Sequence, residues 1–215
     1  MNAIGYEDIK RMLLAAAELI RAHHQRLSEL DSFGGDGDHG TTMVRAMGCL
    51  EKGMAQAADG RIDDLLNQVG WAILGVDGGA TGPLFGSLFM GMGQAVGDRD
   101  AVDVVLLADM FEAARESVAN VTQAQVGDKT LVDALVPAVT ALRAAADKGE
   151  DVLVALDEAA RAAQQGAEGT RDMAARFGRA RNRGEASKGQ PDPGATSMAL
   201  VFQGFAQGVR THGGS

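Results

Sequence analysis

The sequence is poor in cysteine and in aromatic residues: among its 215 residues there are one cysteine, one tryptophan, one tyrosine and seven phenylalanines. The lone Cys49 cannot form an intramolecular disulfide, which excludes a small disulfide-stapled scaffold and fits a reducing compartment. The low aromatic content, together with ten methionines and abundant alanine, favours helices packed through small side chains over a β-sandwich.

Long apolar runs and extended basic stretches are also missing. No apolar run approaches the roughly 18 residues of a membrane span, and the polar start MNAIGYEDIK lacks the pattern of a signal peptide. The formal net charge is -9, and the only arginine cluster lies at 176–183, which argues against a nucleic-acid surface. We therefore expect a cytoplasmic protein with neither a membrane nor a nucleic acid as its partner.

Helical periodicity dominates the chain. Apolar residues recur every three to four positions from Tyr6 to Glu29, as on one face of a helix. The same pattern occurs in seven further segments: 40–58, 61–76, 82–97, 101–119, 130–147, 150–176 and 194–211. No segment shows the alternation of a strand, so strands should be few or absent. Because most connections are short, the sequence predicts an all-α fold, an eight-helix antiparallel up-and-down bundle forming one domain over residues 1–215.

Two connections are longer, polar and glycine-rich, at 32–40 and 178–193, and long loops of this kind are usually functional. The first brings together Asp31, Asp36 and Asp38, whose carboxylates are the ligand type that magnesium and calcium prefer. The EF-hand pattern fails, because counting from Asp36 puts glycine at position 5 and methionine at position 12. A purely structural alternative stays open, in which Asp31 ends one helix and Asp38 caps the next.

The segment from His39 to Thr42 opens the next predicted helix, whose N-terminal N–H groups would face an anion held at the aspartates. A divalent cation beside a helix N-terminus with hydroxyl groups is suited to a polyphosphate. His39 could donate to a phosphate oxygen or could order the loop, and the residues alone leave both open.

Three further loops carry polar groups at predicted helix starts, although each also fits an ordinary turn. The segment 77–84 offers backbone amides and a threonine hydroxyl, yet it is no P-loop because it lacks the Gly-Lys-Ser/Thr ending. The segment 127–133 places Asp128 as a helix cap. In the segment 190–197, Asp192 stands between Pro191 and Pro193, which stiffen the loop and fix its carboxylate.

Together the motifs GDGDHGTT, GGATGPLFGS, GDKTLVDAL and DPGATS, in register with eight helical segments from about Tyr6 to Gln207, resemble the DhaL family of dihydroxyacetone kinase subunits. The resemblance implies an eight-helix barrel that binds ADP or ATP at one end. It implies two Mg²⁺ ions and phosphoryl transfer at Asp31, Asp36, Asp38 and Arg179. The nucleotide-binding positions it implies are His39, Gly40, Thr41, Thr42, Ala80, Thr81, Gly82, Thr130, Leu131, Arg179, Asp192, Pro193 and Gly194.

The chain departs from the family pattern in the late loop, where residues 180–191 read ARNRGEASKGQP without an aromatic residue. Arg179 is matched by ungapped spacing to Asp192, and Arg181 and Arg183 remain alternatives. The resemblance also implies a separate DhaK-type subunit that holds a ketose. The phosphoryl donor is left open between ATP and a DhaM-type phosphocarrier of the phosphotransferase system. The alternative function is a regulatory nucleotide-binding module that signals to a transcription regulator without catalysis.

Overall fold

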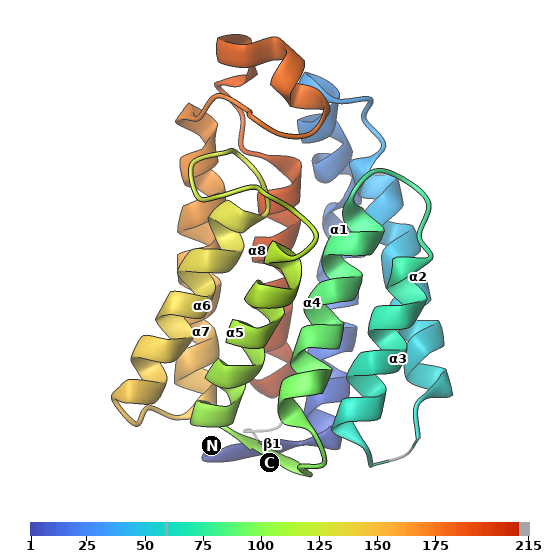
Figure 1. Cartoon of the computed structure of the whole chain (residues 1–215), viewed down its shortest axis with the longest axis vertical. Coiled ribbons are helices and arrows are strands. Elements are labelled where there is room, and N and C mark those ends of the chain that lie inside the picture. The colour runs from blue at the N-terminus through green and yellow to red at the C-terminus, as the bar shows by residue number, and fades with distance from the viewer. Residues whose placement is uncertain (59, 211–215) are drawn as a thin grey trace.

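The computed structural model describes residues 1–58 and 60–210. Within these ranges the chain forms eight α-helices that run up and down along the long axis of the molecule (Figure 1). They are α1 (Tyr6–Gly34), α2 (His39–Gln56), α3 (Ile62–Leu74), α4 (Thr81–Val96), α5 (Val104–Ala119), α6 (Val132–Asp147), α7 (Val152–Gly169) and α8 (Pro193–Arg210). No helix in the described part is both long and apolar enough to cross a membrane.

The helices close into a ring. Each one packs against its neighbours in sequence, and α8 packs back against α1. Because the helices alternate in direction, the loops after α1, α3, α5 and α7 all lie at one end, which we call the loop end (Figure 1). The prediction of an all-α, eight-helix antiparallel barrel is confirmed.

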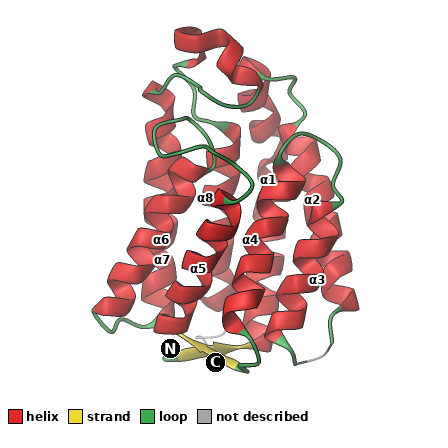
Figure 2. Cartoon of the chain, viewed as in Figure 1, coloured by secondary structure: helices red, strands yellow, loops and turns green. Residues whose placement is uncertain are grey.

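The opposite end carries a short antiparallel ribbon of β1 (Ala3–Gly5) and β2 (Ala101–Asp103) (Figure 2). We call it the ribbon end. The sequence predicted one helix over 101–119, but its first three residues form β2. The reason is local: the Asp103 carboxylate accepts from the Leu106 N–H at 2.8 Å and caps α5, so the helix begins after it.

Other helix boundaries also differ from those that the sequence predicted. The first helix continues five residues past Glu29, so only residues 35–38 remain as the loop before α2. The seventh ends at Gly169, where η1 (Thr170–Asp172), a 3₁₀ turn, replaces the predicted continuation to 176. The predicted cap is wrong: α6 starts at Val132, and Asp128 accepts from the Gln125 N–H at 2.8 Å. Position 211, the predicted end of the last helix, lies outside the described residues.

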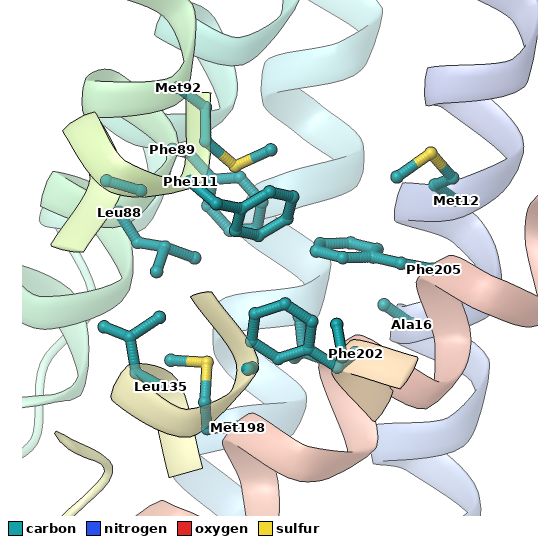
Figure 3. Close-up of a cluster of buried hydrophobic side chains, with 14 of the residues drawn as sticks. Met12, Ala16, Leu88, Phe89, Met92, Phe111, Leu135, Met198, Phe202 and Phe205 are labelled. Atoms are coloured by element: carbon teal, nitrogen blue, oxygen red, sulfur yellow. The ribbon is translucent and has the colours of Figure 1, made fainter. Parts of the chain in front are cut away.

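The core fills the middle of the ring with side chains from several walls (Figure 3). Phe111 of α5 meets Phe202 and Phe205 of α8 with ring centroids 5.1 and 6.0 Å apart, and all three are buried. Burying each such ring contributes about 1.5–3 kcal/mol. The α1–α8 seam is tighter, because a Cβ at Gly204 would clash with the backbone of Ala16. A glycine is therefore required for the ring to close here.

Candidate functional site

A pocket of about 320 Å³ opens at the loop end, a volume typical of small-ligand sites. All four inter-helix loops of this end line it, and so does η2 (Arg179–Ser187), a 3₁₀ segment inside the predicted 178–193 loop. Figure 1 shows η2 in orange above the barrel, beside the end of α1. The four loops that the sequence singled out separately therefore meet at one site.

Three carboxylates gather at the end of α1. Asp31 lies in the last turn of the helix and Asp36 and Asp38 in the loop, and one oxygen of each lies within 4.8 Å of the others. Two glycines allow this. A Cβ at Gly35 would clash with the Asp31 carboxylate, and Gly37 adopts a φ of +79° that side chains disfavour. The loop is thus shaped to bring like charges together, an arrangement that a nearby positive charge would stabilise.

Arg179 supplies positive charge to this cluster. Its Nη1 contacts Asp36 Oδ1 and lies 3.8 Å from Asp38 Oδ1. Arg183 is occupied elsewhere, since its guanidinium lies 4.8 Å from the Phe33 ring centroid and donates to the Phe33 carbonyl. Of these two arginines, Arg179 is the one placed at the aspartates.

His39 links the aspartate loop to α8. Its backbone N–H donates to Asp31 Oδ2 at 3.2 Å, and its ring Nε2 lies 3.1 Å from Ser197 Oγ. Burial lowers the pKa of the imidazole, against the raising effect of Asp31 and Asp38. A neutral ring held between two elements favours the loop-ordering role that the sequence left open.

The glycine-rich turn lies beside the aspartate loop. The Arg45 guanidinium donates to Thr42 Oγ1 at 2.9 Å and to the Asp77 carbonyl at 3.0 Å, which joins α2 to this turn. Ala80 and Thr81 line the pocket at the start of α4, and the N-cap residue Ala80 gives no side-chain hydrogen bond. The first amides of α4 are therefore not satisfied by a side-chain cap, as in helix termini that bind anions.

The far wall is built by the α5–α6 loop and the residues before α8. Thr130 and Leu131 line it from one side, and Pro193 and Gly194 from the other. Asp192 Oδ2 accepts from the Ala195 N–H at 2.7 Å and so caps α8. Burial raises the pKa of Asp192 to about 7, although the Ala195 amide and the nearby Lys129 act in the opposite direction.

Residues 34–207 match the family described as the DAK2 domain. The chain belongs to the DAK2-domain family. It is 36% identical over 204 residues to the PEP-dependent dihydroxyacetone kinase, ADP-binding subunit DhaL, of Escherichia coli strain K12, covering 95% of this chain and 97% of that relative. A similar match, 36% over 197 residues, links it to the ADP-binding subunit DhaL of PEP-dependent dihydroxyacetone kinase 1 of Listeria innocua, covering 92% and 93%. The resemblance to the DhaL family is confirmed.

This DAK2 domain is also similar in fold to the dihydroxyacetone kinase of C. freundii. The native crystal structure aligns with a TM-score of 0.69 at 27% identity, covering 91% of this chain and 33% of that one. The complex with AMP-PNP and Mg²⁺ aligns with a TM-score of 0.68, the same identity and the same coverage. This chain therefore spans about a third of the length of that kinase chain.

Within the DAK2 domain, most of the residues predicted for the site line the pocket, but four do not. Asp36 reaches the aspartate cluster from outside the pocket, and Thr41 is exposed to solvent. Gly40 is packed against α1, where a Cβ would clash with the His24 carbonyl. Gly82 faces the end of α3, where a Cβ would lie 3.0 Å from the Leu74 and Val76 carbonyls. The two glycines serve packing in this structure.

Several lining residues of the DAK2 domain were not among those predicted. The main ones are Phe33, Thr122, Ala124, Lys129, Phe177 and Gln190. Lys129 lies inside the GDKT motif, so its position in the motif was an available signal. Thr122 and Ala124 carry no motif, and only the path of the α5–α6 loop brings them to the pocket.

Proposed function

We propose that this chain is the nucleotide-binding subunit of a kinase for dihydroxyacetone or a related short-chain ketose. The observation that carries the proposal is the carboxylate cluster, with oxygens within 4.8 Å, at the mouth of a pocket of about 320 Å³. Its 36% identity to ADP-binding DhaL subunits over nearly their whole length supports ADP or ATP as the nucleotide. We also propose that the whole chain, 1–215, acts as one domain.

The donor set fits magnesium. Asp31, Asp36 and Asp38 offer only hard oxygen ligands, and the shape of their loop brings like charges together. We propose that these three residues hold the two Mg²⁺ ions implied by the family resemblance. Bound magnesium would neutralise charge on the phosphate oxygens.

The chain's own groups then position the nucleotide. The N-termini of α2 and α4 line the pocket and would offer backbone amides to the phosphates, apart from the His39 N–H, which donates to Asp31. The Thr81 hydroxyl lies at the start of α4. Arg179, already at the aspartates, is within reach of the transferred phosphoryl group and would stabilise its charge. Thr130, Leu131 and the Asp192–Gly194 turn line the pocket and would enclose the base.

We propose that the ketose is held by a second, DhaK-type subunit. The L-erythrulose kinase of Pectobacterium atrosepticum supports this, because the chain is 36% identical to it over 201 residues, which cover 88% of this chain but only 32% of that relative. The chain therefore aligns with only about a third of such a kinase. The phosphoryl donor is either ATP or a DhaM-type phosphocarrier, and the pocket serves both.

The first experiment tests the metal–nucleotide site by thermal unfolding. Mg-ADP at 100 times its Kd stabilises a folded protein by about 2.7 kcal/mol, which corresponds to roughly 5–10 °C in Tm for a chain of this size. Asp36→Asn should abolish this shift. Asp98→Asn, a change at an exposed carboxylate of the ribbon end, is the matched control and should leave the shift intact. An unchanged shift in Asp36→Asn, or none in the wild type, contradicts the proposed site.

The second experiment tests the reaction. The chain is mixed with a DhaK-type subunit, dihydroxyacetone and either ATP or a phosphorylated phosphocarrier, and ketose phosphate is measured. We expect product only when both subunits are present. The donor that supports turnover then decides between the two versions of the enzyme, and no product with either donor rejects catalysis.

A further inference from the structure

Lys129 combines two unfavourable properties. It is the only non-glycine residue in the described ranges with a positive φ, at 62°, and its side chain is buried, with the residue 5% exposed. A left-handed backbone disfavours any residue with a Cβ, and a buried ammonium is costly unless its protons are bonded. A residue that keeps both features must gain stabilisation from its contacts.

Those contacts join three separate loops. Lys129 Nζ donates to the Thr170 carbonyl at 2.7 Å and to the Gln190 carbonyl at 2.7 Å. Lys129 belongs to the α5–α6 loop, Thr170 begins η1 after α7, and Gln190 precedes α8. The ammonium therefore holds the α5–α6 loop against both segments that lead into α8.

Thr170 extends this connection. Its hydroxyl accepts from the Asp192 N–H at 2.7 Å and donates to the Ala167 carbonyl at 2.5 Å, and the residue is fully buried. Lys129 and Asp192 are thus tied to the same threonine, one through its carbonyl and the other through its hydroxyl. Asp192, Pro193 and Gly194 follow directly and form the far wall of the pocket.

Burial and the neighbouring carboxyl groups act on the pKa of this lysine in opposite directions. Burial lowers the pKa of Lys129, and the nearby Arg171 acts in the same direction. Asp192, Asp172 and Asp133 oppose this, with Asp192 the strongest of the three. The acidic residues near the connected loops therefore offset only part of the effect of burial on the pKa of Lys129.

We propose that Lys129 is a positioning residue for the nucleotide. Its ammonium fixes the wall formed by Thr130, Leu131 and the Asp192–Gly194 turn, and it acts through the carbonyls of Thr170 and Gln190 rather than through phosphate. The inference rests on the proposed function, because the wall it fixes is the one that would hold the base.

The test compares Lys129→Met, which removes the charge at similar length, with Lys129→Arg, which keeps charge and donors. The Kd of Mg-ADP is measured by calorimetry for both variants and for the wild type. Loss of two charged hydrogen bonds should weaken binding on the order of 10-fold to 100-fold in Lys129→Met. Lys129→Arg should restore most of it. Equal affinity in Lys129→Met and wild type overturns the inference.

Adenosine separates positioning from direct phosphate contact. If Lys129 acts on the wall, Lys129→Met weakens adenosine and Mg-ADP by the same factor, and added KCl does not change that factor. Arg179→Gln is the matched comparison, because it should weaken Mg-ADP and leave adenosine unchanged. A loss in Lys129→Met confined to Mg-ADP overturns the inference in favour of direct contact.

Hydrogen exchange without nucleotide gives an independent readout. Amides of residues 188–195 should exchange faster in Lys129→Met, while the core of α5 keeps its wild-type rate. Uniformly faster exchange means a general loss of stability and overturns the inference.

If Lys129→Met does not fold, Lys129→Met/Asp192→Asn, which removes the unpaired carboxylate as well, is compared with Asp192→Asn. Failure of the wild type to bind Mg-ADP overturns the proposed function itself, whereas wild-type binding matched by Lys129→Met overturns the role of Lys129 alone.

Discussion

The two ends of the barrel differ in which helix N-termini carry side-chain caps and in what lies beside them. At the ribbon end, Asp103 accepts from Leu106 N–H at 2.8 Å and Asp151 from Val154 N–H at 2.9 Å, so α5 and α7 carry side-chain caps, whereas the N-cap residues of α1 and α3 give no side-chain hydrogen bond. At the loop end, the N-cap residues of α2, α4 and α6 give no side-chain hydrogen bond. Of the helix starts described there, only that of α8 is capped by its own N-cap residue, Asp192, although the Asp31 carboxylate and the Thr130 hydroxyl accept from the first amides of α2 and α6.

A side-chain cap contributes to the stability of a helix, whereas an uncapped helix start can contribute to the binding of an anion. A capped helix start is complete without a ligand, whereas an uncapped one leaves amides and a partial positive charge directed at solvent or an anion. The uncapped starts of α2 and α4 lie beside the carboxylate cluster and line the pocket, so an anion bound there would meet their amides. Net charge alone does not reveal this, because the chain as a whole is acidic.

The largest effect should come from a matched pair of glycine substitutions. Gly35→Ala places a methyl group against the Asp31 carboxylate and should weaken Mg²⁺ and Mg-ADP binding by roughly 10- to 100-fold. Gly149→Ala at the ribbon end meets no atom within 4 Å but has a φ of +69°, so it should cost about 1 kcal/mol of stability. Calorimetric titration and urea unfolding of both variants check this. If Gly149→Ala also lost binding of Mg-ADP, the loop end would not be the only end that affects binding, and the prediction would be contradicted.

A smaller effect is expected from adding an acid to an uncapped start. Ala80→Asp puts a negative charge at the N-terminus of α4 and should stabilise the nucleotide-free protein by roughly 0.3–1 kcal/mol. The same charge would repel phosphate and lower the affinity for Mg-ADP. Urea unfolding and calorimetry measure the two changes. Gains in both stability and affinity would mean that this helix start does not face the phosphates.

A further prediction is a pH dependence at the start of α8, which Asp192 caps at the loop end. Burial raises the pKa of Asp192 from 3.8 to about 7, so the folded protein holds this proton over a range where the unfolded chain releases it. Its contribution to stability is therefore full below pH 3.8, falls as pH rises, and is lost above pH 7. Asp192→Asn should remove this decline. Urea unfolding at several pH values tests it, and parallel pH profiles in the two proteins would contradict the raised pKa.

Much of the fold could be predicted from the sequence because the apolar faces of the helices are long. Eight apolar faces repeat over 13 to 29 residues, and the alternation of directions alone puts the four motif loops at one end. The ribbon was not predicted, because strands of three residues are too short to show an alternating pattern. The cap at Asp103 was hidden inside an apparently continuous helical pattern.

The site was predictable only in part. Spacing brought Asp31, Asp36 and Asp38 together, and resemblance assigned roles to them and to the other loops; those roles stay predictions. The contact of Arg179 with Asp36 spans 143 residues, and the bonds of Lys129 reach 41 and 61 residues away. Such contacts depend on how distant loops pack, which no local pattern encodes.

The seam between α1 and α8 has a consequence for how the chain folds. The helix that closes the ring at Gly204 and supplies Phe202 and Phe205 to the core is the last of the described helices to be synthesised. Until α8 emerges from the ribosome, the apolar face of α1 has no partner on that side. Contacts between the first and last helices are the most distant in sequence, and such contacts slow folding. We expect nascent chains that lack α8 to remain open and prone to association.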